Sequence, residues 1–308
     1  MEKSSFIRQN ILPVLAAFIW GTAFVAQSVG ADYLEPFSFT TARSLIAFFF
    51  LLGLCAILYW RREKTGAPQP GARPGYRRDL LLGGLCCGTA LMLGTNLQQK
   101  GIETTASGKA GFITALYIVI VPILGLFLKK KASRGVWVSV ALAVAGLYCL
   151  CIKEGFSVEP GDVYLFLCSL CFAVQILSID HFAQKVDGVE LSCAQFLMVA
   201  LESAVGMLAA EQPTLEGLRL CMGPLLYVGI LSSGVAYTLQ IVAQRGSNPT
   251  VVSLLLSLES VFATLAGALL LGDRMSGREY LGCVLMLAAV VLAQLPDRRR
   301  ADAERAEA

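Results

Sequence analysis

The feature that most constrains this chain is a series of ten long apolar stretches, separated by segments that hold nearly all of its charges. A helix needs roughly 20 mostly apolar residues to cross a bilayer, and continuous rather than alternating runs argue against membrane strands. The stretches cover about 11–29, 37–59, 80–98, 107–128, 135–151, 163–179, 191–210, 222–243, 250–271 and 280–295. The sequence therefore predicts an all-α membrane protein with ten transmembrane helices.

The composition excludes an ordinary soluble domain. Hydrophobic residues make up 56% of the 308 residues and charged residues only 15%, whereas soluble domains carry about 25% charged residues. The net charge of +3 gives no reason to expect a nucleic-acid partner. The segment 61–79 is rich in Pro, Gly and Arg and is predicted to be a mobile loop. The charged tail over 296–308 is predicted to be disordered and cytosolic.

Two alternative interpretations of local features are less favoured. Lys3 and Arg8 precede the first apolar stretch as in a signal peptide, but that stretch is longer than a signal core and contains Gln27. The ten cysteines lie almost entirely within predicted spans, and His181 is the only histidine. A zinc site needs four converging ligands, so we interpret these cysteines as small apolar residues, with no metal and no cofactor.

The distribution of Lys and Arg orients the chain. If the N-terminus is cytoplasmic, 18 of the 25 basic residues fall on the cytoplasmic side and six on the outside, with Arg43 left within a span. Cytoplasmic loops of membrane proteins carry an excess of Lys and Arg. The sequence therefore predicts that both termini are cytoplasmic.

The two halves of the chain resemble each other. Asn96-Leu97-Gln98 ends the third apolar stretch much as Thr238-Leu239-Gln240 ends the eighth, and Trp137 and Tyr280 open the last stretch of each half. Since five helices are an odd number, the second half must enter the membrane from the opposite side, as in inverted-repeat transporters. We predict two five-helix repeats over 11–152 and 161–295.

Several segments carry a family resemblance over essentially the whole chain. They are Trp20 to Phe24, Arg43, Ala110 to Tyr117 with Val121-Pro122, and Ser253 to Ala263 followed by Leu270 to Arg274. Together they resemble the drug/metabolite transporter superfamily, and within it the permeases with two EamA-type repeats. Ser260 and Asp273 depart from the frequent Pro and Glu of that pattern. The resemblance implies an inner-membrane carrier, often an exporter of amino acids, metabolites or drugs.

Uncharged polar and aromatic residues within the spans are candidates for a substrate site near the midplane. Amides donate and accept hydrogen bonds, and aromatic rings provide walls for apolar parts of a ligand. Some of these residues are alternatively hydrogen bonds between helices. The predicted substrate-binding residues are Trp20, Asn96, Gln99, Tyr117, Gln175, Tyr237 and Gln240.

Three charged residues stand out inside predicted spans, where a central charge costs about 2.5–3.5 kcal/mol on insertion scales: Arg43, Glu202 and Glu259. Glu259 is interpreted either as a ligand for a substrate amine or exchangeable proton, or as a buried anchor between helices. Arg43 either pairs with a carboxylate or faces substrate, and Glu202 is assigned a packing or lipid-interface role. Pro122 interrupts the fourth span and is a candidate gate hinge, with close packing as the alternative.

The sequence thus predicts a secondary transporter of small polar metabolites that works by alternating access. It contains no nucleotide-binding GxxxxGK[ST] loop, so we expect coupling to substrate or ion gradients, protons included. An intramembrane enzyme would need converging catalytic groups, which the single histidine does not supply. A membrane sensor or scaffold that binds a ligand without moving it is the alternative. The expected partners are a small-molecule substrate and the lipid bilayer, with a monomer or a homodimer as the assembly.

Overall fold

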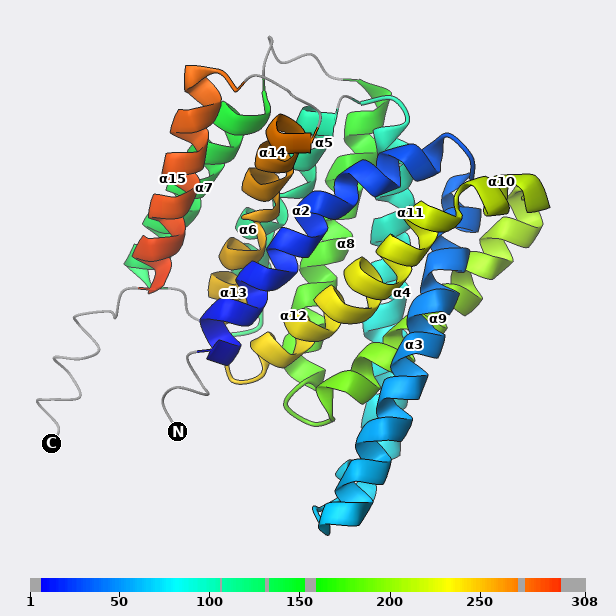
Figure 1. The fold of residues 1–308 in the computed structure, drawn as a ribbon. Helices are drawn as coiled ribbons and strands as arrows, with labels where there is room; N and C mark the ends of the chain where they lie inside the picture. Colours follow the sequence, from blue (N-terminus) through cyan, green and yellow to red (C-terminus); the bar gives the residue numbers. More distant parts are fainter. Residues whose placement is uncertain (1–6, 106, 131–132, 153–158, 271–274, 295–308) are drawn as a thin grey trace, which may run out of the picture.

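The computed structural model is a helical bundle with ten spans. It describes residues 7–105, 107–130, 133–152, 159–270 and 275–294, of which 85% are helical and none is in a strand (Figure 1). The predicted tail over 296–308 lies outside this part. Ten helical segments are long and apolar enough to cross a membrane, which confirms the predicted fold class. In chain order they are η1 (Ile7–Ile11) with α2 (Leu12–Ala31), α3 (Pro36–Thr65), α4 (Tyr76–Ile102), α5 (Ser107–Thr114) with α6 (Tyr117–Phe127), α7 (Arg134–Cys151), α8 (Pro160–Phe182), α9 (Gly188–Ala210), α11 (Met222–Leu226) with η3 (Tyr227–Ala236) and α12 (Tyr237–Gln244), α13 (Pro249–Leu256) with α14 (Glu259–Leu270), and α15 (Gly277–Gln294).

The segment predicted as a long mobile loop, 61–79, is largely ordered. Helix α3 continues beyond the apolar stretch to Thr65 and ends at Gly66, whose φ of 65° lies in the left-handed region that glycine adopts easily. The short helix η2 (Pro70–Ala72) follows, and α4 already begins at Tyr76. Hydropathy alone placed the end of α3 too early, because Arg and Lys favour helix as strongly as many apolar residues do.

The outer surface of the bundle is apolar. Phe127 and Leu269 are 82% and 83% exposed, and many other large apolar side chains on the spans are exposed as well. Soluble monomers rarely expose apolar patches on this scale, whereas lipid tails cover such a surface without cost. The exposed residues therefore mark the face that meets the bilayer.

The spans form two four-helix bundles, and each bundle mixes both repeats. The first bundle contains α4, α5–α6, α8 and α9, with α4 packed along α8 and α9. The second bundle contains α2, α3, α11–η3–α12 and α13–α14, with α2 packed along η3 and α14. The bundles meet along α3 and α9, and α7 packs along α15 at the other side of the molecule (Figure 1). This arrangement is the one that an inverted repeat produces, since each contact in one bundle has its counterpart in the other.

The two ends of the bundle are distinguishable by the chain itself. Helix α2 begins and α15 ends on the same face of the molecule, as an even number of spans requires (Figure 1). We refer to this as the terminal face, where α3 also ends and α9 begins. The opposite, distal face holds the end of α2, the start of α3 and the end of α4. The pocket described below lies between these faces.

Candidate functional site

A central cavity lies between the two bundles. It holds about 530 Å³ of space free of protein atoms, including the part open to solvent. Both bundles contribute to its wall. The lining residues are Trp20, Phe24, Gln27, Arg43, Gln98, Tyr117, Phe172, Gln175, Ile176, Ser232, Tyr237, Gln240, Leu256 and Glu259.

Part of this lining is duplicated by the repeat. Gln98 and Gln240 each lie four residues before the last residue of their helix, and Tyr117 and Glu259 each begin the helix that follows a break. The first pair keeps the residue type, and the second places a phenol opposite a carboxylate. The two repeats therefore give the cavity a duplicated amide and an asymmetric charge.

Arg43 is the positive group of the cavity. Its side chain is only 4% exposed, and its Nη1 donates a hydrogen bond of 3.0 Å to Oε1 of Gln27. The guanidinium also lies beside the hydroxyl of Tyr237. Its Nε is buried without a hydrogen-bond partner, and no carboxylate of the described residues forms an ion pair with it. Of the two interpretations from sequence, this geometry favours a group that faces the cavity.

Glu259 is the negative group, and it lies where two interrupted helices meet. Tyr117 begins α6 and Glu259 begins α14, and the Tyr117 hydroxyl donates a hydrogen bond of 3.4 Å to Oε1 of Glu259. Glu259 is 8% exposed and has no basic partner within the described residues. A buried carboxylate without a cation costs several kcal/mol. It therefore requires a cationic ligand or a proton.

Pro122 does not explain these interruptions. It lies within α6, after the break that separates α5 from α6. The break between α13 and α14 occurs at the equivalent place, although the residue equivalent to Pro122 there is Thr264. The interruption therefore belongs to the repeat rather than to the proline. The role of Pro122 as a gate hinge stays a prediction.

Aromatic rings form one wall of the cavity. The rings of Trp20 and Tyr237 have centroids 4.6 Å apart with an interplanar angle of 57°. The indole Nε1 of Trp20 donates a hydrogen bond of 3.2 Å to the carbonyl oxygen of Ser232. Because its polar atom is satisfied by the backbone, Trp20 presents an apolar surface to the cavity.

The structure separates the residues predicted for the site into two groups. Those that line the cavity are Trp20, Tyr117, Gln175, Tyr237, Gln240, Glu259 and Arg43. Asn96 and Gln99 do not line it. Asn96 donates to Met92 O and to Ser203 Oγ of α9, and Gln99 donates to the carbonyl oxygen of Gln27 at 3.5 Å.

Sequence reasoning left seven lining residues out of the predicted site: Phe24, Gln27, Gln98, Phe172, Ile176, Ser232 and Leu256. Gln27 and Gln98 are polar residues within spans, and they share the signal that selected Gln175 and Gln240. Matching the ends of α4 and α12 pairs Gln98 with Gln240, so a comparison of the two repeats would have found Gln98. Phe24 and Phe172 carry no such signal, because phenylalanine is common throughout these spans.

Glu202, the third charged residue of the spans, lies away from the cavity. Its Oε1 accepts a hydrogen bond of 2.6 Å from Thr89, which joins α9 to α4 within the first bundle. This contact agrees with the predicted packing role. The cysteines are all unbridged thiols, and the described residues contain no cluster of three His, Cys, Asp or Glu that could hold a metal.

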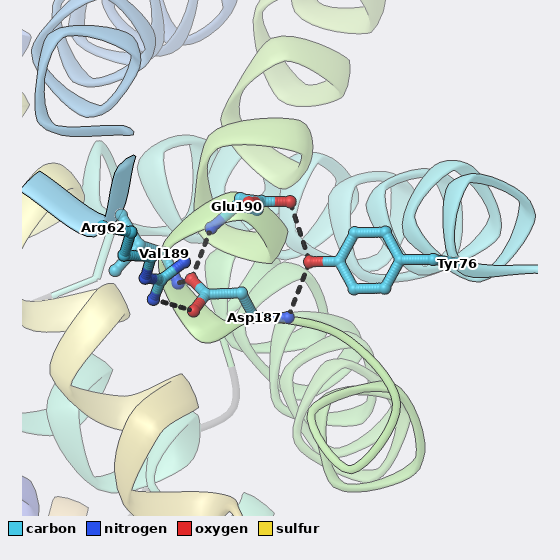
Figure 2. Close-up of polar contacts among 5 residues, drawn as sticks. All are labelled: Arg62, Tyr76, Asp187, Val189 and Glu190. Carbon is cyan, nitrogen blue, oxygen red and sulfur yellow. Dashed lines mark hydrogen bonds and ion pairs between the residues drawn. The ribbon is translucent and has the colours of Figure 1, made fainter. Parts of the chain in front are cut away.

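A second polar cluster fixes the start of α9 at the terminal face (Figure 2). Asp187 caps the helix by accepting from the backbone N–H groups of Val189 and Glu190 at 3.0 and 3.4 Å, and its other oxygen pairs with Arg62 of α3 at 2.9 Å. The Tyr76 hydroxyl donates to Glu190 at 2.7 Å and accepts from the backbone N–H of Asp187 at 3.0 Å. This cluster thus ties α9 to both α3 and α4.

Comparison with known proteins places the chain among membrane transporters. It is 29% identical over 91% of its length to an uncharacterized transporter of Archaeoglobus fulgidus, of which it covers 84%. It is 25% identical to the uncharacterized transporter sll0355 of Synechocystis, over 93% of this chain and 89% of that one. It is 24% identical to the uncharacterized inner membrane transporter YedA of Escherichia coli, over 93% and 92%.

The fold also occurs among solved structures. One protein of known crystal structure superposes with a TM-score of 0.75 over 94% of this chain and 98% of its own, at 18% identity. At this identity the likeness concerns the fold alone. A sequence profile of the EamA-like transporter family matches residues 8–152 and again residues 159–295. This chain is a multi-pass membrane protein that belongs to the EamA-like transporter family.

Proposed function

We propose that this chain is a secondary transporter that moves small zwitterionic metabolites, amino acids or related compounds, through the central cavity by alternating access, and that it works as an exporter. One observation carries the choice of substrate. The cavity contains a buried arginine and a buried glutamate, neither of which has an oppositely charged partner within the described residues.

The two charges fit a ligand that carries both signs. A substrate carboxylate would accept two hydrogen bonds from the guanidinium of Arg43, whose Nε has no other partner. A substrate ammonium group would neutralise Glu259. The amides of Gln27, Gln175 and Gln240 would hold polar substituents, and Trp20 with Phe24 would cover apolar ones. The same walls would accept amphipathic drugs that carry an amine.

Glu259 gives the transporter a means of coupling. Without substrate, a proton is the simplest cation that can neutralise this buried carboxylate. Release of a substrate ammonium on one side and uptake of a proton there would return the carrier with Glu259 neutral. We therefore propose proton exchange as the driving reaction, with facilitated diffusion as the alternative that the experiment below distinguishes.

The location and direction follow from charge and resemblance. The terminal face collects most of the Lys and Arg residues in the predicted topology, so we assign it to the cytoplasm. A bacterial inner membrane is the proposed location, which the relative YedA supports by its name. Export is proposed because many permeases of this type are exporters.

The experiment is a metabolite profile of cells and medium that express the parent chain or one of two variants. Glu259→Gln removes the carboxylate of the cavity and is expected to abolish release of the transported class at equal membrane levels. Glu202→Gln is the matched control, because it removes a half-buried carboxylate of α9 that does not line the cavity. It is expected to export at the parent rate.

The other outcomes are equally informative. If Glu259→Gln exports as well as the parent, the coupling role of Glu259 is wrong and facilitated diffusion remains. If the parent chain changes the metabolites of neither the cells nor the medium, accumulation is measured in proteoliposomes that have an acidic interior and are given a mixture of amino acids. Specific binding without accumulation in that assay would identify the chain as a sensor and overturn the transport proposal.

A further inference from the structure

Among the described residues, more side-chain hydrogen bonds join the two bundles at the end of α12 than at the end of α4. The end of α12 contacts the first bundle through three hydrogen bonds. Thr238 Oγ1 donates to Ser192 Oγ at 2.8 Å, Gln240 Nε2 donates to Gln175 Oε1 at 3.4 Å, and Gln244 Nε2 donates to the Ile176 carbonyl oxygen at 3.0 Å. These bonds close the space between α12, α8 and α9.

A chain of amides continues this closure. Gln175 donates from its Nε2 to Oε1 of Gln195 at 3.1 Å while its own Oε1 accepts from Gln240. Gln195, on α9, and Arg43, on α3, occupy the same position relative to the first residue of their helices. The contact between Gln175 and Gln195 joins α8 to α9, and the contact between Gln27 and Arg43 joins the corresponding helices α2 and α3.

The distal face has the mirrored residues but lacks the mirrored bonds. By position in the repeat, Gln98 corresponds to Gln240, Asn96 to Thr238, and Thr40 to Ser192. Gln98 faces the cavity, and no hydrogen bond joins it to Gln27. Asn96 is 7% exposed, yet its Oδ1 accepts no hydrogen bond from the described residues. Among the described residues, the only hydrogen bond between α4 and α2 on this side runs from Gln99 to the carbonyl oxygen of Gln27, at 3.5 Å.

We infer that Gln98, Asn96, Gln27 and Thr40 form the second gate of this carrier. In the alternate conformation, Gln27 Nε2 donates to Gln98 Oε1 and the Thr40 hydroxyl donates to Asn96 Oδ1, while the bonds from Gln240 and Thr238 break. Such an exchange keeps the number of buried hydrogen bonds nearly constant, so that the two states differ little in free energy. The inference rests on the alternating access of the proposed function and adds the residues that perform it.

The Arg62–Asp187 pair does not serve as such a gate. It closes the terminal end of the seam between α3 and α9, but the distal end of the same seam is closed as well. There Glu211, just after α9, accepts from the backbone N–H groups of Phe37 and Ser38 at the start of α3, at 2.8 and 2.6 Å. Since both ends are held in one conformation, this seam fits a fixed pivot between the bundles.

Hydrogen exchange on the purified full-length chain in lipid nanodiscs tests the inference without any substrate. Gln240→Leu destabilises the present conformation and should raise amide exchange at the end of α12 by about three- to tenfold, which is the effect of one lost hydrogen bond between membrane helices. Gln98→Leu destabilises the alternate conformation and should lower exchange at the same amides by a similar factor. The double variant should return close to the parent.

Two further variants keep the result interpretable. Gln240→Asn and Gln98→Asn retain the amide but shorten the side chain. If the Leu variants fail to fold, Gln240→Asn should still raise amide exchange at the end of α12 and Gln98→Asn should still lower it. Arg62→Gln should raise exchange at the start of α9 only. If both gate variants raise exchange at α12, or if Gln98→Leu leaves it unchanged, the second gate is wrong. If the metabolite profile shows no transported class while Gln240→Leu and Gln98→Leu change amide exchange in opposite directions, the proposed substrate is wrong and the gate stands.

Discussion

Single residues decide what the cavity can bind, and the strongest constraint comes from Arg43. A cation inside a membrane protein is usually paired, but here its polar neighbours are the amide of Gln27 and the phenol of Tyr237. Neutral partners orient a guanidinium without cancelling its charge. The charge therefore remains available to an anionic group of a ligand, as the proposed substrate class requires.

We expect Arg43→Gln to lower the apparent affinity for a zwitterionic substrate by at least about tenfold, because one hydrogen bond to a charged group contributes about 1.5–3 kcal/mol. Arg43→Lys should lose less, since it keeps the charge but not the planar pair of donors. Concentration-dependent uptake into proteoliposomes measures both. Equal uptake by the parent and Arg43→Gln would show that this arginine contacts no substrate.

At the scale of helices, close approach of α2 and α14 fixes the position of Glu259. A Cβ atom added at Gly21 would lie 2.7 Å from the carbonyl oxygen of Glu259 and 2.6 Å from Cβ of Phe262. Such distances are too short for carbon and oxygen atoms without movement of a backbone. Only glycine at this position lets α2 pack against the first turn of α14, where the carboxylate enters the cavity.

Gly21→Ala should therefore push α2 away from α14 and destabilise the protein by about 1–3 kcal/mol, as overpacking does. Gly53→Ala is the matched control in α3, because nothing lies within 4 Å of its added Cβ. That variant should be neutral or stabilised by about 0.5–1 kcal/mol through helix propensity. Thermal unfolding in detergent, followed by tryptophan fluorescence, compares the two. Similar midpoints for both variants would contradict the close contact.

At the scale of the whole molecule, the exchange of partners between repeats shapes the carrier. Each bundle takes two spans from the first repeat and two from the second, so a movement of one bundle against the other changes contacts in both repeats. The pairs α3 with α9 and α7 with α15 pack at opposite sides of the molecule (Figure 1). This architecture lets one set of duplicated residues serve both faces of the membrane in turn.

The orientation of the molecule is a prediction at this scale. An epitope inserted between α3 and α4, next to Gly71, should be protected from an externally added antibody in intact cells and become accessible after permeabilisation. An epitope between Gln212 and Pro213 at the distal face should be accessible before it. The opposite pattern would reverse the assignment of the faces and, with it, the proposed direction of export.

The sequence by itself determined the ten spans and their division into two repeats. Apolar length measures what a bilayer requires of each helix, and an odd number of helices in each repeat forces the inversion. It also marked the buried ionisable residues, because a charge within a span needs a special reason. The order of the matching segments was enough to identify the family resemblance that the sequence profile confirms.

Tertiary structure alone decided which face of each helix meets the cavity. In a soluble helix an apolar stripe marks the buried side, but lipid and protein interior are equally apolar, so hydropathy carries no such mark here. This is why Gln98 lines the cavity while neighbouring Gln99 and Asn96 do not. The same holds for Arg43, whose contact with Gln27 depends on how α2 and α3 pack, a long-range arrangement that no local pattern encodes.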